Sequence, residues 1–262
     1  MVQTPAMPAP DTLTAFRQDL LTALGFLTRL PLPAGGAAEA AGVRRALRLF
    51  PLVGALVGLI GALAFWAVRE LGLDPWLSGA IAVAVTTLVT GALHEDGLAD
   101  TADGLGGGRD AAHKLEIMRD SRLGAYGGLA LVFSVLLRAS ALAALAEPGL
   151  ATAALLAAHS ASRGALPAVM AMLPSARAEG LGAAVGAPDR SDLLLALALA
   201  AAIPVLALGL KTGFFVLVLI VLAAALVARL ARRQLGGLTG DILGAVQQAC
   251  EIAALLTVAA LS

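Results

Sequence analysis

The sequence predicts an all-α, polytopic integral membrane protein, and three observations support that fold class. Hydrophobic residues make up 59% of the chain, against about 45–50% in ordinary soluble domains. Charged residues make up only 14%, and several apolar runs reach the roughly 20 residues that a helix needs to cross about 30 Å of hydrocarbon. Lysines and arginines gather in alternate short loops, as in multi-pass proteins. We therefore expect a bundle of about seven transmembrane helices, forming a single membrane-embedded domain over residues 1–262.

The apolar runs set the order of the expected helices. The predicted spans are approximately 50–71, 76–93, 128–146, 150–172, 192–210, 213–230 and 242–261. Before them we expect an amphipathic helix at 12–31, whose apolar residues recur every three or four positions: Leu13, Phe16, Leu20, Leu24 and Leu27. Asp11 or Thr12 should cap its N-terminus, and Pro31-Leu32-Pro33 should end it. Because it is short and partly polar, it should lie on the membrane surface.

The positions of the basic residues predict the orientation. The first set of loops carries Arg44, Arg45, Arg48, Arg109, Lys114, Arg119, Arg122, Arg177, Arg190, Arg229, Arg232 and Arg233, and the alternate loops carry only Arg69 and Lys211. Basic residues in short loops favour the cytoplasmic side. We therefore expect the N-terminus, and the acidic and basic segments described below, to lie on the cytoplasmic side. Trp66 and Trp76 flank the first outer turn, where aromatic residues meet the membrane interface.

Charge and cysteine content exclude several classes of protein. The 18 basic and 18 acidic residues balance, so no overall charge favours a nucleic-acid partner. Cys250 is the single cysteine, so neither a disulfide framework nor a thiolate zinc site can form within one chain.

An acidic segment follows the second span directly. Residues 94–104 read His-Glu-Asp-Gly-Leu-Ala-Asp-Thr-Ala-Asp-Gly. The spacing of Asp96, Asp100 and Asp103 places them within roughly 60° of one another on a helix. Three such carboxylates repel one another unless a cation lies between them, and hard oxygen ligands suit Mg²⁺, Mn²⁺ or Ca²⁺. The sequence thus predicts a metal site here, although a solvated acidic helix end would have the same composition.

Two neighbours of the aspartates have less certain roles. Glu95 should point about 100° away from the aspartate face, so we rank it below the three aspartates as a ligand. His94 can serve as a ligand, a general base or a structural residue, and the sequence does not distinguish these roles.

The same loop contains a basic segment. Residues 116–128 read Glu-Ile-Met-Arg-Asp-Ser-Arg-Leu-Gly-Ala-Tyr-Gly-Gly. Arg119 and Arg122 are about one helical turn apart, and arginine binds phosphate through paired, planar hydrogen bonds. The glycines would let backbone amides approach an anion. We therefore expect a phosphate-binding segment, whereas an ordinary basic loop would explain the charges but not the glycines.

Charged residues inside the predicted spans form a third group. Arg138, Arg163 and Glu251 all lie about 14–15 Å from the cytoplasmic ends of their helices. Charges at that depth need a partner or a wet cavity, so Glu251 should pair with one or both arginines. This pairing would either stabilise the bundle or line a substrate cavity.

Asp241 opens the last predicted helix after the Gly-rich loop 236–240. An acid at this position is stabilised by the helix macrodipole. The N-terminus of a helix also favours anionic ligands. We interpret Asp241 as a further metal ligand, with a purely helix-stabilising role as the alternative.

Taken together, these segments resemble the cobalamin (cobamide) synthase family, also called adenosylcobinamide-GDP ribazoletransferases. The resemblance rests on Phe-Leu-Thr-Arg-Leu-Pro at 26–31, residues 96–104, residues 115–128, Ser-Arg-Gly at 162–164, Glu-Gly-Leu-Gly at 179–182 and residues 236–241. The family pattern of His, a variable residue and Asp-Gly matches His94, Asp96 and Gly97, with Glu95 at the variable place.

The resemblance implies a Mg²⁺-dependent membrane transferase with phosphotransferase-type chemistry. Adenosylcobinamide-GDP and α-ribazole, or its 5′-phosphate, would give adenosylcobalamin, or its 5′-phosphate, and GMP. The expected catalytic residues are Asp96, Asp100, Asp103 and His94, and the expected metal ligands are Asp96, Asp100, Asp103 and Asp241. The expected substrate-binding residues are Arg119, Arg122, Arg29, Arg163 and Glu251. A homo-oligomer, or association with other late corrinoid-pathway enzymes, is compatible with the sequence, but no residue favours either.

Two other functions fit parts of the sequence. CDP-alcohol phosphotransferases also carry spaced aspartates on a membrane helix, but their pattern continues with Ala-Arg, whereas Asp100 follows Ala99 here. A secondary transporter could carry the intramembrane charges. Transporters bind their substrates near the midplane, whereas this acidic cluster is predicted at the membrane edge.

Overall fold

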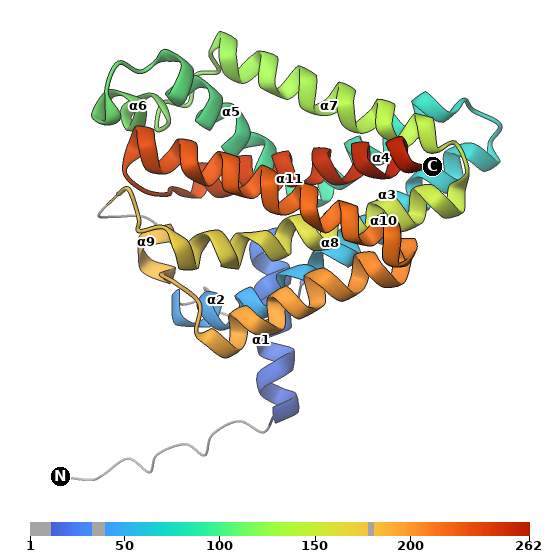
Figure 1. Cartoon of the computed structure of the whole chain (residues 1–262), viewed down its shortest axis with the longest axis horizontal. Coiled ribbons are helices and arrows are strands. Elements are labelled where there is room, and N and C mark those ends of the chain that lie inside the picture. Colours follow the sequence, from blue (N-terminus) through green and yellow to red (C-terminus); the bar gives the residue numbers. More distant parts are fainter. Residues whose placement is uncertain (1–11, 33–39, 178–180) are drawn as a thin grey trace.

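The computed structural model describes residues 12–32, 40–177 and 181–262, and these residues confirm the all-α fold class (Figure 1). The elements are α1 (Thr12–Leu27), α2 (Ala40–Ala46), the 3-10 helix η1 (Leu47–Leu49), α3 (Phe50–Glu70), α4 (Pro75–Thr90), α5 (Leu93–Gly107), α6 (Ala111–Ile117), α7 (Ala125–Leu145), α8 (Pro148–Met172), α9 (Leu181–Val185), α10 (Arg190–Leu235) and α11 (Gly240–Leu261). Helix α1 ends before the predicted stop at Pro31, and the predicted cap residue Asp11 lies outside the described residues.

The count of seven spans is not confirmed. By length and composition, four helical segments of the described chain could cross a membrane, namely Ala40–Glu70, Ala125–Leu145, Arg190–Leu235 and Gly240–Leu261. The bent pair α4 and α5 would make a fifth. Helix α8 lies where the 150–172 span is predicted. It is not among the candidates, because its histidine, serines and arginine lower its mean hydropathy.

Helix α10 contains both the 192–210 and the 213–230 predicted spans. It runs for 46 residues, but Gly209 has φ 78° and ψ 167°, which breaks the helix between the two predictions. Figure 1 shows α10 running out to this break and then returning. A Cβ added at Gly213 would lie 2.8 Å from the Cα of Val205, so the two arms pack closely beside the break.

A sharp turn between α4 and α5 changes the direction of the chain, so that the acidic segment on α5 runs across the bundle. The two helix axes differ by 93°, because Gly91 and Ala92 both adopt positive φ angles, 64° and 56°. The left-handed conformation costs a non-glycine residue about 1–2 kcal/mol. Arg29 braces the turn, since its backbone N–H donates to Val89 O at 2.7 Å and its side chain covers Gly91. The predicted span 76–93 therefore ends at Thr90, and α5 follows as a separate helix.

Helix α8 packs at the centre of the bundle against α3, α10 and α11. The glycines of the first predicted span bring α3 close to its neighbours. A Cβ added at Gly58 would lie 2.5 Å from the carbonyl oxygen of Leu155 on α8, and one at Gly61 would lie 2.6 Å from Thr86 on α4. Helices α7 and α10 expose leucine, valine and phenylalanine side chains on their outer faces. Contiguous exposed apolar surface of this kind suits contact with lipid.

A buried arginine on α7 joins three helices. The Nη1 atom of Arg138 lies 3.0 Å from Oε1 of Glu95 on α5 and 3.0 Å from Oε1 of Glu251 on α11. Gln248 also donates to Glu95 at 3.2 Å, as does Thr87. All these contacts lie inside the bundle, where ion pairs are screened far less than at the surface.

The second carboxylate oxygen of Glu251 reaches α8. Its Oε2 atom lies 3.1 Å from Nδ1 of His159 and 3.7 Å from Nη1 of Arg163, and it accepts a hydrogen bond from Gln247 at 2.6 Å. The predicted pairing of Glu251 with the intramembrane arginines is therefore confirmed. The sequence ranks Glu95 below the three aspartates as a metal ligand, and in the structure its side chain belongs to this same set of buried contacts. We call Arg138, Glu95, Glu251, His159 and Arg163 the buried ion network.

Arg138→Met tests the contribution of this network. Removing the arginine leaves Glu95 and Glu251 without their shared cation, and breaking a buried pair costs about 3–5 kcal/mol. We expect a correspondingly lower thermal midpoint in detergent, measured by light scattering or intrinsic fluorescence. The matched control is Arg229→Met on the exposed face of α10, for which about 0.5 kcal/mol or less is expected. Equal effects of the two substitutions would contradict a stabilising role.

Candidate active site

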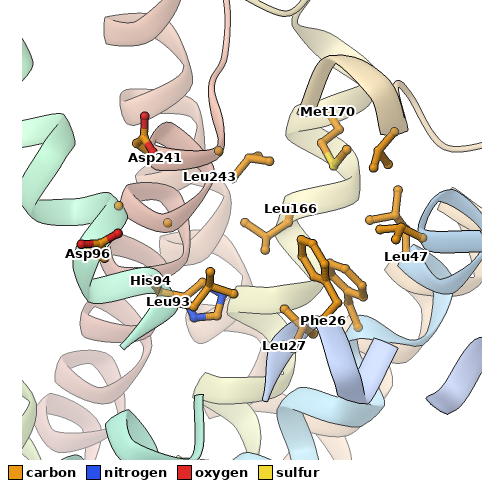
Figure 2. A pocket seen from close by; sticks show the side chains of 16 residues that line it. Phe26, Leu27, Leu47, Leu93, His94, Asp96, Leu166, Met170, Asp241 and Leu243 are labelled. Atoms are coloured by element: carbon orange, nitrogen blue, oxygen red, sulfur yellow. The ribbon is translucent and has the colours of Figure 1, made fainter. Parts of the chain in front are cut away.

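A cavity of about 220 Å³ lies where α5 and α11 begin (Figure 2). Ten apolar side chains and three glycines form most of its wall, and the polar side chains in the wall are His94, Asp96 and Asp241. The loops that contain α6 and α9, and the loop between α10 and α11, lie at this same end of the bundle (Figure 1). The cavity therefore lies at the end that carries the predicted basic loops.

Two glycines bring α5 and α11 together at the cavity. A Cβ added at Gly97 would lie 2.8 Å from the carbonyl oxygen of Asp241, and one added at Gly244 would lie 3.0 Å from both the Cα of Gly97 and the carbonyl oxygen of His94. The backbones thus approach as closely as two helices can. As a result, Asp96 and Asp241, in the first turns of their helices, face the same cavity. Free N–H groups at these helix starts favour negative charge.

The aspartates of the acidic segment lie on one uninterrupted helix, as their spacing predicts. Asp96, Asp241 and Asp103 all lie close enough to Asp100 to repel its negative charge. Asp96 is exposed, whereas Asp100 and Asp241 are half-buried. We call Asp96, Asp100 and Asp241 the carboxylate cluster. Such a group needs a cation or protons to be stable.

Asp103 has a second set of contacts that the sequence did not indicate. Its Oδ2 accepts the N–H of Gly124 at 2.7 Å, and its Oδ1 accepts the N–H of Gly127 at 2.8 Å. These are the free N–H groups at the start of α7, so Asp103 caps that helix from α5. The glycines predicted to approach an anion do so, and the anion in the structure is this carboxylate.

Arg177 supplies positive charge to the cluster and was missed as a site residue. Its Nη1 lies 3.3 Å from Oδ2 of Asp241. The backbone around it is fixed by a short parallel pairing between two loops, in which Leu238 N–H donates to Pro174 O at 2.9 Å and Ala176 N–H donates to Leu238 O at 2.8 Å. In the sequence Arg177 is only one more loop arginine, because its partner lies on a helix far along the chain.

The predicted arginines of the basic segment lie apart from the cavity. Arg119 and Arg122 are exposed, and the hydrogen bonds of Arg122 to Asp120 lower the pKa of that carboxyl to about 2. Neither guanidinium contacts the carboxylate cluster within the described ranges. Arg29 lies against the turn between α4 and α5.

His94 is buried, with 3% of its surface exposed, and faces the cavity from the first turn of α5. Its imidazole makes no hydrogen bond or ion pair to another residue of the described chain. Arg163 and Glu251 lie deeper in the bundle and do not line the cavity. Thus the structure brings His94 to the cavity together with the cluster, and places the other two in the buried ion network.

The cluster offers hard oxygen donors but not a complete cage. Among the described residues, no three histidine, cysteine, aspartate or glutamate side chains stand close enough together to enclose a metal ion by themselves. Carboxylate oxygens are nevertheless hard donors, and Mg²⁺ in proteins is usually held by one or two carboxylates together with water and substrate phosphates.

Known proteins resemble this chain over nearly its whole length. It is 50% identical over 254 residues to an adenosylcobinamide-GDP ribazoletransferase of Bradyrhizobium diazoefficiens, covering 97% of this chain and 98% of that one. It is 46% identical over 253 residues to one from Mesorhizobium japonicum, covering 95% and 97%, and 47% identical over 250 residues to one from Azorhizobium caulinodans, covering 92% and 94%.

No solved structure matches the chain. The family model described as cobalamin-5-phosphate synthase matches residues 19–259. With the relatives above, that match shows that this chain belongs to the cobalamin-5-phosphate synthase family.

Proposed function

We propose that this chain is an adenosylcobinamide-GDP ribazoletransferase, which completes the nucleotide loop of cobalamin. It joins adenosylcobinamide-GDP to α-ribazole, or to α-ribazole 5′-phosphate, and releases GMP. The observation that carries the proposal is the carboxylate cluster, of which Asp96 and Asp241 line the cavity, in a chain 50% identical to a relative of that name. We further propose that the end of the bundle with the cavity and the basic loops faces the cytoplasm of a bacterial inner membrane.

The hard oxygen donors of Asp96, Asp100 and Asp241 fit Mg²⁺, and they would hold it together with water and the substrate phosphates, not as a complete cage. Bound there, Mg²⁺ would neutralise charge on the diphosphate and on the departing GMP. Arg177 pairs directly with Asp241 and also lies close enough to Asp100 to stabilise its negative charge, and a bound Mg²⁺ would add the further positive charge that the three carboxylates need. Asp103 lies close enough to Asp100 to act on it, but its hydrogen bonds to α7 favour a role in fixing that helix.

The residues around the cavity would accept the proton and bind the substrates. A hydroxyl oxygen of α-ribazole attacks the phosphorus next to cobinamide, and the bond from that phosphorus to the oxygen of GMP breaks. The hydroxyl proton passes to a ring nitrogen of His94 or to the carboxylate of Asp96 or Asp241, since these groups line the cavity. Arg119 and Arg122 remain our proposed phosphate-binding residues, and Arg29 remains a proposed substrate-binding residue. Arg163 and Glu251 support α8 and α11 and do not touch substrate in this proposal.

Turnover in detergent tests the function directly. We expect the purified protein to convert adenosylcobinamide-GDP and α-ribazole to adenosylcobalamin only when Mg²⁺ is present, with GMP as the second product by chromatography. CDP-diacylglycerol, the donor of CDP-alcohol phosphotransferases, should not react. Activity with CDP-diacylglycerol alone would reject the proposal.

Single Asn substitutions test the carboxylate cluster. Asp96→Asn, Asp100→Asn and Asp241→Asn should each lower kcat/KM by on the order of 100-fold or more, because each removes charge at the reacting phosphates. Each should also raise the Mg²⁺ concentration that gives half-maximal rate. The control is Glu116→Gln on the exposed face of α6, which should leave both quantities within about twofold. Unchanged Mg²⁺ dependence in all three variants would rule out the cluster as the metal site.

Asp103→Asn separates a capping role from a ligand role. Losing part of the cap on α7 should lower stability by about 1 kcal/mol, while the Mg²⁺ concentration at half-maximal rate stays close to wild type. If that concentration rises as far as it does for Asp96→Asn, Asp103 is a metal ligand, as its spacing in the sequence predicts.

A further inference from the structure

The cavity has two chemically different sides. Figure 2 shows Asp96, Asp241 and His94 on one side, and Phe26, Leu47 and Met170 on the other. The apolar side has no charged side chain in its wall. A ligand that fills the cavity must therefore have one apolar part and one polar part.

The apolar side is closely packed and has aromatic rings. The rings of Phe26 and Phe50 stack with their centroids 5.7 Å apart and their planes 20° apart. Leu27, Leu47 and Phe50 expose 2% or less of their surfaces, so they are held by the core behind them. Packing of this kind favours a ligand of fixed shape over a chain that changes conformation.

The size of the cavity limits which part of the substrates can enter. Its volume of about 220 Å³ is below the roughly 300–1,000 Å³ of sites for drug-sized ligands. A fused two-ring base fits this space, whereas a corrin macrocycle does not. Guanine has the right size, but its polar edge would lie against leucine, methionine and phenylalanine side chains without hydrogen-bond partners.

We infer that the apolar side of this cavity binds the benzimidazole base of α-ribazole and turns its ribose toward His94 and the carboxylate cluster. The base is flat and largely apolar, so it matches the stacked phenylalanines and the leucines. The sugar hydroxyls match the polar side, where the attack on phosphorus takes place. A lipid chain is a poorer occupant, because it would lie against two carboxylates and gain nothing from them. The inference rests on the proposed function and adds where the acceptor substrate binds.

Leu166→Phe tests the inference, because Leu166 is a buried apolar residue of the wall on α8 and is not part of the cluster. Filling the cavity should raise KM for α-ribazole at least tenfold and leave KM for adenosylcobinamide-GDP within twofold. The control, Leu206→Phe on the exposed face of α10, should change neither KM. Leu166→Ala enlarges the cavity instead, and should raise kcat/KM for a ribazole analogue with a third fused ring relative to α-ribazole.

The possible results distinguish a failure of the base-binding inference from a failure of the proposed function. If the wild-type protein forms no adenosylcobalamin, the proposed function fails and the inference fails with it. If the wild type turns over but Leu166→Phe raises only KM for adenosylcobinamide-GDP, the cavity binds guanine. If both Leu166 variants turn over and change neither KM nor base preference, the cavity binds no substrate. If Leu166→Phe does not fold, the base preference of Leu166→Ala decides, and an unchanged preference rejects the inference.

Discussion

The position of Arg138 between Glu95 and Glu251 is the constraint on which the site depends. A guanidinium in the middle of a bundle is stable only beside its counter-charges, so α5, α7 and α11 must meet in one arrangement. Glu95 is flanked in sequence by His94 and Asp96. Fixing Glu95 inward therefore fixes the rotation of α5 about its axis and with it the directions of both neighbours, which point about 100° to either side of Glu95 and line the cavity. The network controls the direction of the first turn of α5 without touching the cavity itself.

A second constraint is steric. Gly97 and Gly244 allow the backbones of α5 and α11 to touch, and this contact determines how far apart Asp96 and Asp241 lie. The side chains of Asp96 and Asp241 can rotate to reduce their repulsion, but their backbones are held together by the contact between the two helices. The structure thus keeps two negative charges near one another, where a cation that also binds a diphosphate would neutralise them.

Local patterns in the sequence predicted local structure well. The three-and-four spacing of the aspartates predicted one helix, and α5 is that helix. The charges at equal depth predicted the pairing of Glu251 with arginine. Features that depend on tertiary contacts were not predictable in this way. The positive φ at Ala92 gives no sequence signal, Arg177 reaches Asp241 through a pairing of two loops, and the N–H groups that bind Asp103 belong to a helix that begins 22 residues later. The count of seven spans is not confirmed, because α8 is not among the candidate spans and α10 is counted as one candidate, although its break at Gly209 lies close to the predicted boundary between two spans.

The parallel pairing between Pro174–Ala176 and Leu238 limits how these two loops can vary. Loops usually tolerate insertions, because little depends on their backbone. Here each loop provides the hydrogen-bonding edge of the other, and together they fix the distance from Arg177 to Asp241. An added residue in either loop would shift the pairing and separate the two side chains. For protein engineering, an affinity tag or a fusion partner therefore belongs at a turn without such a pairing, such as that at Gly72, where an added Cβ would meet no atom within 4 Å, and not at 173–177 or 236–239.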